Sequence, residues 1–251
     1  MTESKALTTT EEVTAMIPRL AEVRDVIAGA LAGGTVTEFQ LDRVHVPGAG
    51  GTTWTIPTLE GDIETKTIEG VIVGYKMTRG YWPKPYSAGD PTPPDCASND
   101  GVTGTGDRGP HGSGPQDCRT CPLAQWGTKL REGKQTRSQA CKAMMPVFLL
   151  TPRSMLPVVI TVPPSSLKSV TPYPLRLAGQ GINWWGCISQ FTLEKETVGG
   201  YPTAVVKTKF VSRLSAEQTE ALRQYKEALA PLVRQAVVDV EGGVVEDELF
   251  E

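Results

Sequence analysis

The segment that most constrains how this chain can fold is residues 83–117, because its composition cannot supply a hydrophobic core. Seven prolines and seven glycines occur among its 35 positions, and Val102 is its only aliphatic β-branched residue. Ordering a backbone costs about 1–2 kcal/mol per residue, which apolar burial or another source of stability must offset. We therefore expect that something other than a hydrophobic core orders this segment.

Cysteines placed around this segment offer such a source of stability. Four of the chain's five cysteines follow the spacing C-x21-C-x2-C-x19-C, whereas Cys187 lies in an apolar stretch typical of a core strand. A C-x2-C pair presents two thiolates to one metal ion from a tight turn, and two further cysteines complete a tetrahedron. The spacing predicts one structural Zn²⁺, held by Cys96, Cys118, Cys121 and Cys141.

Other uses of these cysteines were weighed against zinc. Disulfides are disfavoured because the N-terminus lacks the basic and apolar regions of a secretion signal, and a thioredoxin-like pair would need a βαβ surround. An iron–sulfur cluster and inert thiols stay open as alternatives, and His111 is a second-choice ligand. A catalytic deaminase zinc is not indicated, because His111 and Cys118 lack the H-x-E and P-C-x-x-C context of that site.

Hydrophobic patterning predicts a mainly β fold with flanking helices, in the α+β class. Short segments rich in Thr, Val, Ile and aromatic residues alternate with Gly and Pro, as successive strands do. These predicted strand segments are residues 35–46, 52–57, 64–82, 145–151, 156–162, 182–196 and 201–213. An amphipathic helix is predicted before them, over residues 14–32.

A second helix is predicted over residues 215–236. Ser215 and Gln218 form a capping box, and Leu222 and Tyr225 begin an apolar stripe. Pro231 is expected to kink or end this helix. The predicted organisation is a helical segment over 1–34, a barrel domain over 35–236 that contains the zinc insertion 83–144, and a tail over 237–251.

Charge is distributed unevenly along the chain. The net charge is −3, yet residues 235–251 hold six acidic residues and no Lys or Arg, which leaves the remainder mildly basic. These carboxylates have no partner charges within the segment, so we expect the tail to be mobile.

Aromatic rings and positive charges occur together in two regions, a combination typical of single-stranded nucleic-acid binding. Rings stack on unpaired bases while Lys and Arg contact the phosphates. In the strand predicted over 182–196, the adjacent Trp184 and Trp185 are expected to point to opposite faces, which assigns part of the rings to the core. The predicted DNA-binding residues are Tyr75, Lys76, Arg79, Tyr81, Trp82, Lys84, Tyr86, Lys207 and Lys209.

Several blocks of the sequence resemble a group of tailed-phage proteins that includes phage single-stranded DNA-binding proteins. The blocks are residues 95–104, 118–127 (CRTCPLAQWG), 140–142, 147–150 and 163–168, and the resemblance covers about residues 64–235. It implies an OB-type β-barrel with a zinc-stabilised insertion, which coats single-stranded DNA in replication or recombination. The acidic end is similar to the segments by which such proteins bind replication and recombination proteins, which implies as partner-binding residues Asp247, Glu248, Leu249 and Phe250.

Two other functions stay open beside DNA coating. Glu64 and Lys66 have the E-x-K form of metal-dependent nuclease centres with Asp62 nearby, although carboxylates alternating along a strand edge are also typical of a solvated surface. The second alternative is a zinc-bearing structural or adaptor protein of a phage particle. No phosphate-binding loop, nucleophile elbow, signal peptide or apolar run of the ~18 residues that cross a membrane occurs. We therefore expect a non-enzymatic, soluble protein of the cytoplasm, the host's if the chain is phage-encoded.

Overall fold

The structure is a computed structural model, and its described residues fall into two units. Unit 1 holds the described residues up to Tyr75 and those from Val147 onward, whereas unit 2 holds residues 76–146. The helix predicted over 14–32, apart from two residues, and the tail predicted over 237–251 lie outside the described residues. The residues described are Glu12, Ala15, Ile17, 41–83, 94–106, 114–131 and 133–234.

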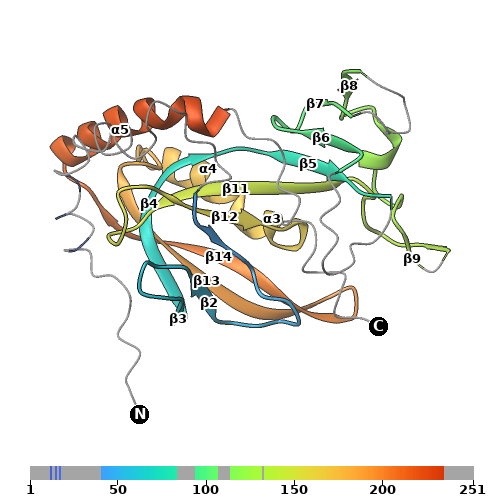
Figure 1. Cartoon of the computed structure of the whole chain (residues 1–251), viewed down its shortest axis with the longest axis horizontal. Coiled ribbons are helices and arrows are strands. Elements are labelled where there is room, and N and C mark those ends of the chain that lie inside the picture. Colours follow the sequence, from blue (N-terminus) through green and yellow to red (C-terminus); the bar gives the residue numbers. More distant parts are fainter. Residues whose placement is uncertain are drawn as a thin grey trace, which may run out of the picture. The chain divides into compact units, whose positions relative to one another are not determined.

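Unit 1 is built from the strand segments that the sequence predicts, together with two helices that it does not predict (Figure 1). The strand β11 (Lys142–Leu150) begins in unit 2 and ends in unit 1. The other elements are β1 (Arg43–Val44), β2 (Trp54–Ile56), β3 (Ile63–Thr65), β4 (Thr67–Tyr75), β12 (Val158–Val162), α3 (Pro164–Val170), α4 (Pro172–Ala178), β13 (Cys187–Val198), β14 (Tyr201–Arg213) and α5 (Ala216–Arg234).

The sheet of unit 1 runs in the order β1-β12-β11-β4-β13-β14 and curls strongly into a half-barrel (Figure 1). β1 pairs with β12 in parallel, whereas β11, β4, β13 and β14 pair antiparallel. Register shifts occur at Phe148/Leu149 and Ile188/Ser189, and such bulges increase local twist. A Cβ at Gly70 would lie 2.4 Å from the carbonyl oxygen of Leu150, so β4 and β11 can approach this closely only at a glycine. The predicted α+β, mainly β class is confirmed.

The core of unit 1 lies between the sheet and α5. Leu222 and Tyr225 of α5 are buried against Val71 and Val73 of β4 and against Phe148 of β11. Complete burial of a leucine such as Leu222 contributes about 1.5–3 kcal/mol. The apolar stripe predicted for this helix is thus confirmed where the structure describes its side chains.

The start of α5 also follows the prediction. The backbone amide of Gln218 donates to Oγ of Ser215 (3.1 Å), and the amide of Ser215 donates to Oε1 of Gln218 (2.9 Å), which confirms the capping box. The helix continues past Pro231 to Arg234, so the proline does not end it. A proline has no backbone N–H, so the helix lacks one hydrogen bond at this position. None of the described helices is long and apolar enough to cross a membrane.

The helices α3 and α4 interrupt what the sequence predicts as an uninterrupted succession of strands. Each begins at a proline, Pro164 or Pro172, whose missing amide and fixed φ suit the first turn of a helix. α3 also protects the outer edge of β14. The amide of Val206 donates to Oγ of Ser166 (2.9 Å), and Oγ of Ser169 donates to the carbonyl of Val206 (2.6 Å). An edge strand whose backbone groups are satisfied in this way does not recruit another strand.

Unit 2 consists of short elements with little apolar burial. β5 pairs with β6 and with the start of β11, and the remaining strands form two-residue pairs. The elements are β5 (Thr78–Tyr81), β6 (Cys96–Ser98), β7 (Thr103–Gly104), β8 (Gln116–Asp117), η3 (Pro122–Ala124), β9 (Leu130–Arg131) and β10 (Lys134–Gln135). Apart from cysteines, the buried apolar side chains among its described residues are Ala124, Ala143, Met144, Met145 and Pro146. This set is small for a unit of this length.

Candidate metal centre and nucleic-acid interface

The four cysteines predicted as metal ligands all lie in unit 2, on four separate elements or turns. Cys96 begins β6, Cys118 follows β8, Cys121 precedes η3, and Cys141 precedes β11. Backbone hydrogen bonds hold three of these cysteines in place. The amide of Cys118 donates to the carbonyl of Val102 (2.8 Å), that of Cys121 to Asp117 (3.1 Å), and that of Cys141 to Leu123 (2.8 Å).

Two of the four sulfurs flank Gly104 on β7. An ideal Cβ at this position would lie 3.0 Å from Sγ of Cys96 and 3.3 Å from Sγ of Cys118. Both sulfurs therefore approach one point that a side chain would occupy. The glycine keeps that space open between them.

The turn that carries the C-x2-C pair is fixed by Asp117 and Arg119. Nε and Nη2 of Arg119 donate to the two carboxylate oxygens of Asp117 at 3.0 and 2.9 Å. This hydrogen bonding from Arg119 lowers the pKa of Asp117. The amide and hydroxyl of Thr120 both donate to the Asp117 carbonyl (3.2 Å each), which closes the turn on its backbone side.

Burial and neighbouring thiols raise the pKa of three of the four cysteines. Burial raises the pKa of Cys96 and Cys118, and raises the pKa of Cys141 to about 12. Other cysteines of the set add to the rise in each case, Cys121 among them. Thiolates gathered here therefore need a compensating cation. The Arg79 guanidinium opposes the rise for Cys118 and Cys141, and its Nη1 is buried without a hydrogen-bond partner among the described residues.

The donor set suits zinc in type and number, because four thiols and no disulfide are present. The structure does not, however, gather any three described His, Cys, Asp or Glu side chains into an arrangement that could hold a metal ion. His111, the second-choice ligand, lies outside the described residues. Cys187 is fully buried in unit 1, and Tyr173 and Ser189 lie beside it, as predicted for a core residue.

The second candidate site is a group of rings on unit 1, which we call the ring cluster: Tyr75, Trp184 and Trp185. The Tyr75 and Trp184 rings meet edge to face with their centroids 5.4 Å apart, and the centroids of the Trp184 and Trp185 rings are 4.9 Å apart. Nζ of Lys226 on α5 lies 5.1 Å from the Trp184 ring and 4.3 Å from the Trp185 ring, within the range of cation–π attraction. Tyr75, at the end of β4, is 37% exposed.

The prediction that Trp184 and Trp185 point to opposite faces of a strand was wrong. β13 begins only at Cys187, and the two tryptophans lie in the turn before it, where adjacent rings can contact each other. The sequence analysis also missed Lys226. Lys226 follows the buried Tyr225 on α5, which suggests a position near the sheet. Its contact with the tryptophans depends on the turn before β13, which the sequence does not predict.

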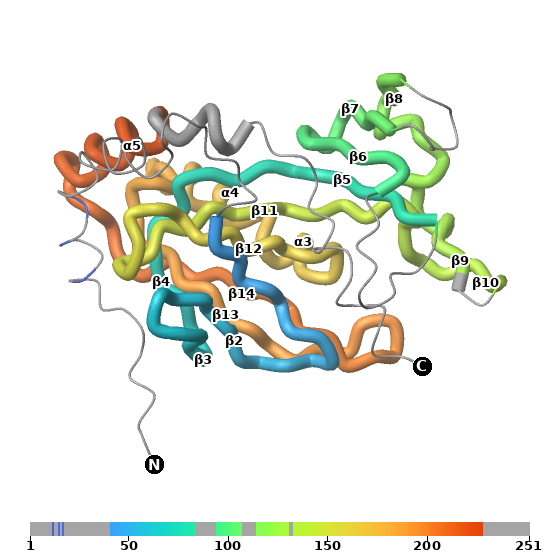
Figure 2. The backbone as a smooth tube through the Cα atoms, in the orientation of Figure 1, coloured from blue at the N-terminus to red at the C-terminus, as the bar shows by residue number. Residues whose placement is uncertain are grey.

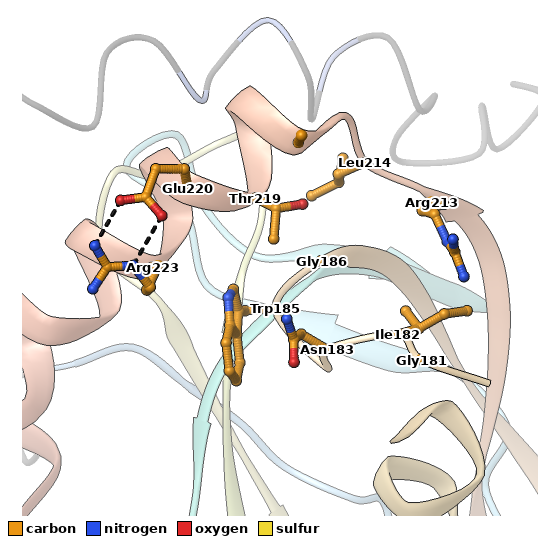
Figure 3. Close-up of a pocket in the computed structure, with 11 residues that line it drawn as sticks. Gly181, Ile182, Asn183, Trp185, Gly186, Arg213, Leu214, Thr219, Glu220 and Arg223 are labelled. Atoms are coloured by element: carbon orange, nitrogen blue, oxygen red, sulfur yellow. Dashed lines mark hydrogen bonds and ion pairs between the residues drawn. The ribbon is translucent and has the colours of Figure 1, made fainter. Parts of the chain in front are cut away.

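A pocket of about 380 Å³ adjoins this cluster, lined by Trp185, Arg213 and the first turns of α5 (Figure 3). Glu220 and Arg223 on its rim are paired through two hydrogen bonds, of 2.9 and 2.6 Å, so their charges offset each other. Nη2 of Arg213 donates to the carbonyl of Gln180 (3.4 Å), and Arg213 forms no ion pair with a described residue. The pocket thus combines an indole, a cation and a size within the range of small-ligand sites.

The two lysines predicted on β14 differ in their surroundings. Nζ of Lys207 bonds Glu196 (2.5 Å) and lies 3.6 Å from Glu194, and hydrogen bonding from Glu196 raises the pKa of Lys207. Its charge is therefore shared with two carboxylates of β13. Lys209 is exposed on the same strand, opposite Gln190.

The predicted DNA-binding residues of unit 2 that the structure describes are half-buried. The positive charge of Arg79 opposes the rise in the pKa of Cys118 and Cys141, and the Lys76 amide donates to the Pro146 carbonyl (3.2 Å). Tyr81 ends β5 and Trp82 follows it, both half-buried. The other predicted positions, Lys84 and Tyr86 for DNA and Asp247, Glu248, Leu249 and Phe250 for partners, lie outside the described residues.

The carboxylates weighed for a nuclease lie on the hairpin of β2 and β3. Asp62 and Glu64 are exposed there. Nζ of Lys66 donates to the hydroxyls of Thr52 (3.1 Å) and Thr53 (2.6 Å), so this lysine anchors the loop that precedes β2.

No family model, curated protein or solved structure matches this chain.

Proposed function

We propose that the protein binds single-stranded DNA without catalysing a reaction on it, and that zinc on Cys96, Cys118, Cys121 and Cys141 stabilises unit 2. The finer fold proposed for the half-barrel is an OB-type barrel, as in the phage single-stranded DNA-binding proteins that the sequence resembles. The proposal includes a place in DNA replication or recombination in the cytoplasm. It also includes capture of partner proteins by the acidic residues near Phe250.

The observation that carries DNA binding is the ring cluster on unit 1. Trp184 contacts both Tyr75 and Trp185, Tyr75 is more than a third exposed, and the positive charge of Lys226 lies over the two tryptophans. The adjoining pocket adds Arg213. Rings for bases together with cations for phosphates are what proteins use to hold single strands without reading their sequence.

The small amount of apolar burial in unit 2 supports a structural zinc. Besides cysteines, the apolar side chains that its described residues bury are two alanines, two methionines and one proline, and its strands beyond β5 and β11 are two or three residues long. Small units with too little apolar burial generally need a metal or disulfides, and no disulfide is present. Bound zinc would supply that stability through the four thiolates, with Arg79 as a neighbouring cation.

A fluorescence titration with oligo(dT) tests DNA binding, because two of the five tryptophans belong to the ring cluster. We expect quenching at low salt that added salt reverses. Tyr75→Ala should weaken binding by about 1–3 kcal/mol, the range for one stacked base. Tyr201→Ala is the matched control, since Tyr201 is 38% exposed on unit 1, beyond the ring cluster.

The outcomes separate the alternatives. Equal loss of affinity for Tyr75→Ala and Tyr201→Ala would show that the ring cluster is not part of the DNA-binding site. Absence of quenching in the wild-type protein would favour the structural or adaptor function. Cleavage of a labelled strand in Mg²⁺ would favour the nuclease.

A further inference from the structure

Trp126 in unit 2 is an aromatic side chain that the structure leaves in solvent. It is 77% exposed, whereas Trp54 of unit 1 is fully buried. Neither the metal centre nor the ring cluster uses it. A single exposed ring is ordinary on a protein surface, so its surroundings decide whether it can serve as a contact site.

Hydrogen bonds fix the turn on the N-terminal side of this ring. Nε2 of Gln125 donates to the carbonyls of Arg119 (3.0 Å) and Cys121 (3.2 Å). Oγ1 of Thr128 lies within hydrogen-bond distance of the carbonyls of Leu123 (3.1 Å) and Gln125 (2.7 Å). The turn is therefore tied to the C-x2-C loop.

The C-terminal side of the ring is fixed as well. The amides of Gly127, Thr128 and Lys129 all point to the carbonyl of Ser138, at 3.1 to 3.2 Å. Gly127 has a φ of +83°, a conformation that L side chains rarely adopt. Because the backbone on both sides is held, presenting the indole requires little additional ordering on binding.

The segment that contains Trp126 is rich in basic residues. Between Cys118 and Lys142 the sequence has five Lys or Arg residues against one acidic residue, Glu132. Lys134 and Arg137 are exposed and form no ion pair with a described residue. They lie on and just after β10, which pairs with β9 in a hairpin (Figure 2). Arg119 is excluded from this set because Asp117 binds its guanidinium.

We propose that Trp126 stacks on an unpaired base while Lys134 and Arg137 contact the neighbouring phosphates, which makes unit 2 a second DNA-contacting surface. This inference rests on the proposed function and assigns a part of it to residues that the sequence analysis did not select. The excess of positive charge favours a polyanion over an apolar protein partner, although Leu130 is also exposed nearby.

Anisotropy of a labelled oligo(dT) with the full chain tests the inference. Trp126→Ala should lower affinity by roughly 5- to 150-fold, and Trp126→Phe should retain most of it, because a ring still stacks. Leu130→Ala is the matched control: Leu130 is 63% exposed on the same hairpin but has no ring, and its loss should leave affinity unchanged.

The cations are tested by salt dependence. Lys134→Gln and Arg137→Gln should each lower the slope of log affinity against log salt by about 0.7, the value for one phosphate contact on a single strand. Arg153→Gln, at an exposed position of unit 1, should leave the slope unchanged. If the wild-type protein binds and Trp126→Ala binds equally well, this inference is wrong while the proposed function stands. If the wild-type protein does not bind at low salt, both are wrong.

Discussion

Gly104 is the residue on which the cysteine geometry depends most directly. Replacing it by alanine would place a methyl group 3.0 Å from Sγ of Cys96 and 3.3 Å from Sγ of Cys118, so the sulfurs would have to separate. We expect Gly104→Ala to lower zinc affinity by roughly 10- to 100-fold, the range for changes just outside a ligand set. Competition with a chromogenic chelator measures this affinity.

Gly179→Ala is the control for this prediction. A Cβ at Gly179, after α4 in unit 1, would meet its nearest atoms at 3.5 and 3.6 Å, which is ordinary contact. It should leave zinc affinity unchanged. Undiminished zinc affinity in Gly104→Ala would mean that these two sulfurs do not share a metal.

At the scale of single residues, the sequence indicates which side chains can bind a metal or a phosphate, but not which other side chains lie beside them. Cysteine spacing predicts four metal ligands, and the structure places the sulfurs of Cys96 and Cys118 on either side of Gly104. Lys207 was predicted to contact phosphate, yet Glu194 and Glu196 reach it across the strand pair. That pairing depends on the register of β13 with β14, which charge patterning alone does not give.

Among the elements, α4 and β13 meet through a buried polar contact that links stability to pH. The hydroxyls of Tyr173 and Ser189 lie 2.9 Å apart, and burial raises the pKa of Tyr173 from 10.0 to about 12. Below pH 10 the tyrosine is neutral in both states. Between about pH 10 and 12 the unfolded chain loses this proton while the folded chain keeps it, so stability falls by about 1.4 kcal/mol per pH unit.

Tyr173→Phe should therefore flatten the alkaline loss of stability. It should also lower the free energy of unfolding at pH 7 by about 1 kcal/mol, because the hydrogen bond is lost. Urea unfolding at several pH values between 8 and 12 measures both effects. Tyr201→Phe, at an exposed position, should behave as wild type. Parallel alkaline losses in wild type and Tyr173→Phe would assign the effect to other groups.

Element by element, strands were easier to predict than helices. The Val- and Ile-rich runs of β4 and β12 are short apolar stretches typical of buried strands, and polar and apolar residues alternate in part of β14. The sequence does not predict α3 and α4, because each has only seven residues and begins at a proline, a residue that also separates strands. The curl of the sheet was also beyond prediction from the pattern, since it depends on bulges and on the close approach at Gly70.

At the scale of the whole molecule, the two units differ in what stabilises them. Unit 1 has a continuous core that includes Phe148, Ile188 and Leu222. Unit 2 buries few apolar side chains and carries the four cysteines. Removing zinc should therefore destabilise unit 2 and leave unit 1 folded. We expect a strong chelator to raise protease cleavage within residues 76–146 selectively, with the cleavage sites identified by mass spectrometry.

Substitutions at cysteines give this prediction its sharpest form, because the chain carries thiols in both units. The double variant Cys118→Ser/Cys121→Ser removes two ligands and should lose the metal, with cleavage in unit 2 as after chelation. Cys187→Ser places a hydroxyl in the core of unit 1, so it should lower the stability of unit 1 while the metal stays bound. Elemental analysis measures zinc and also detects iron, which would indicate an iron–sulfur cluster. One zinc per chain in the double variant would show that these cysteines do not hold it.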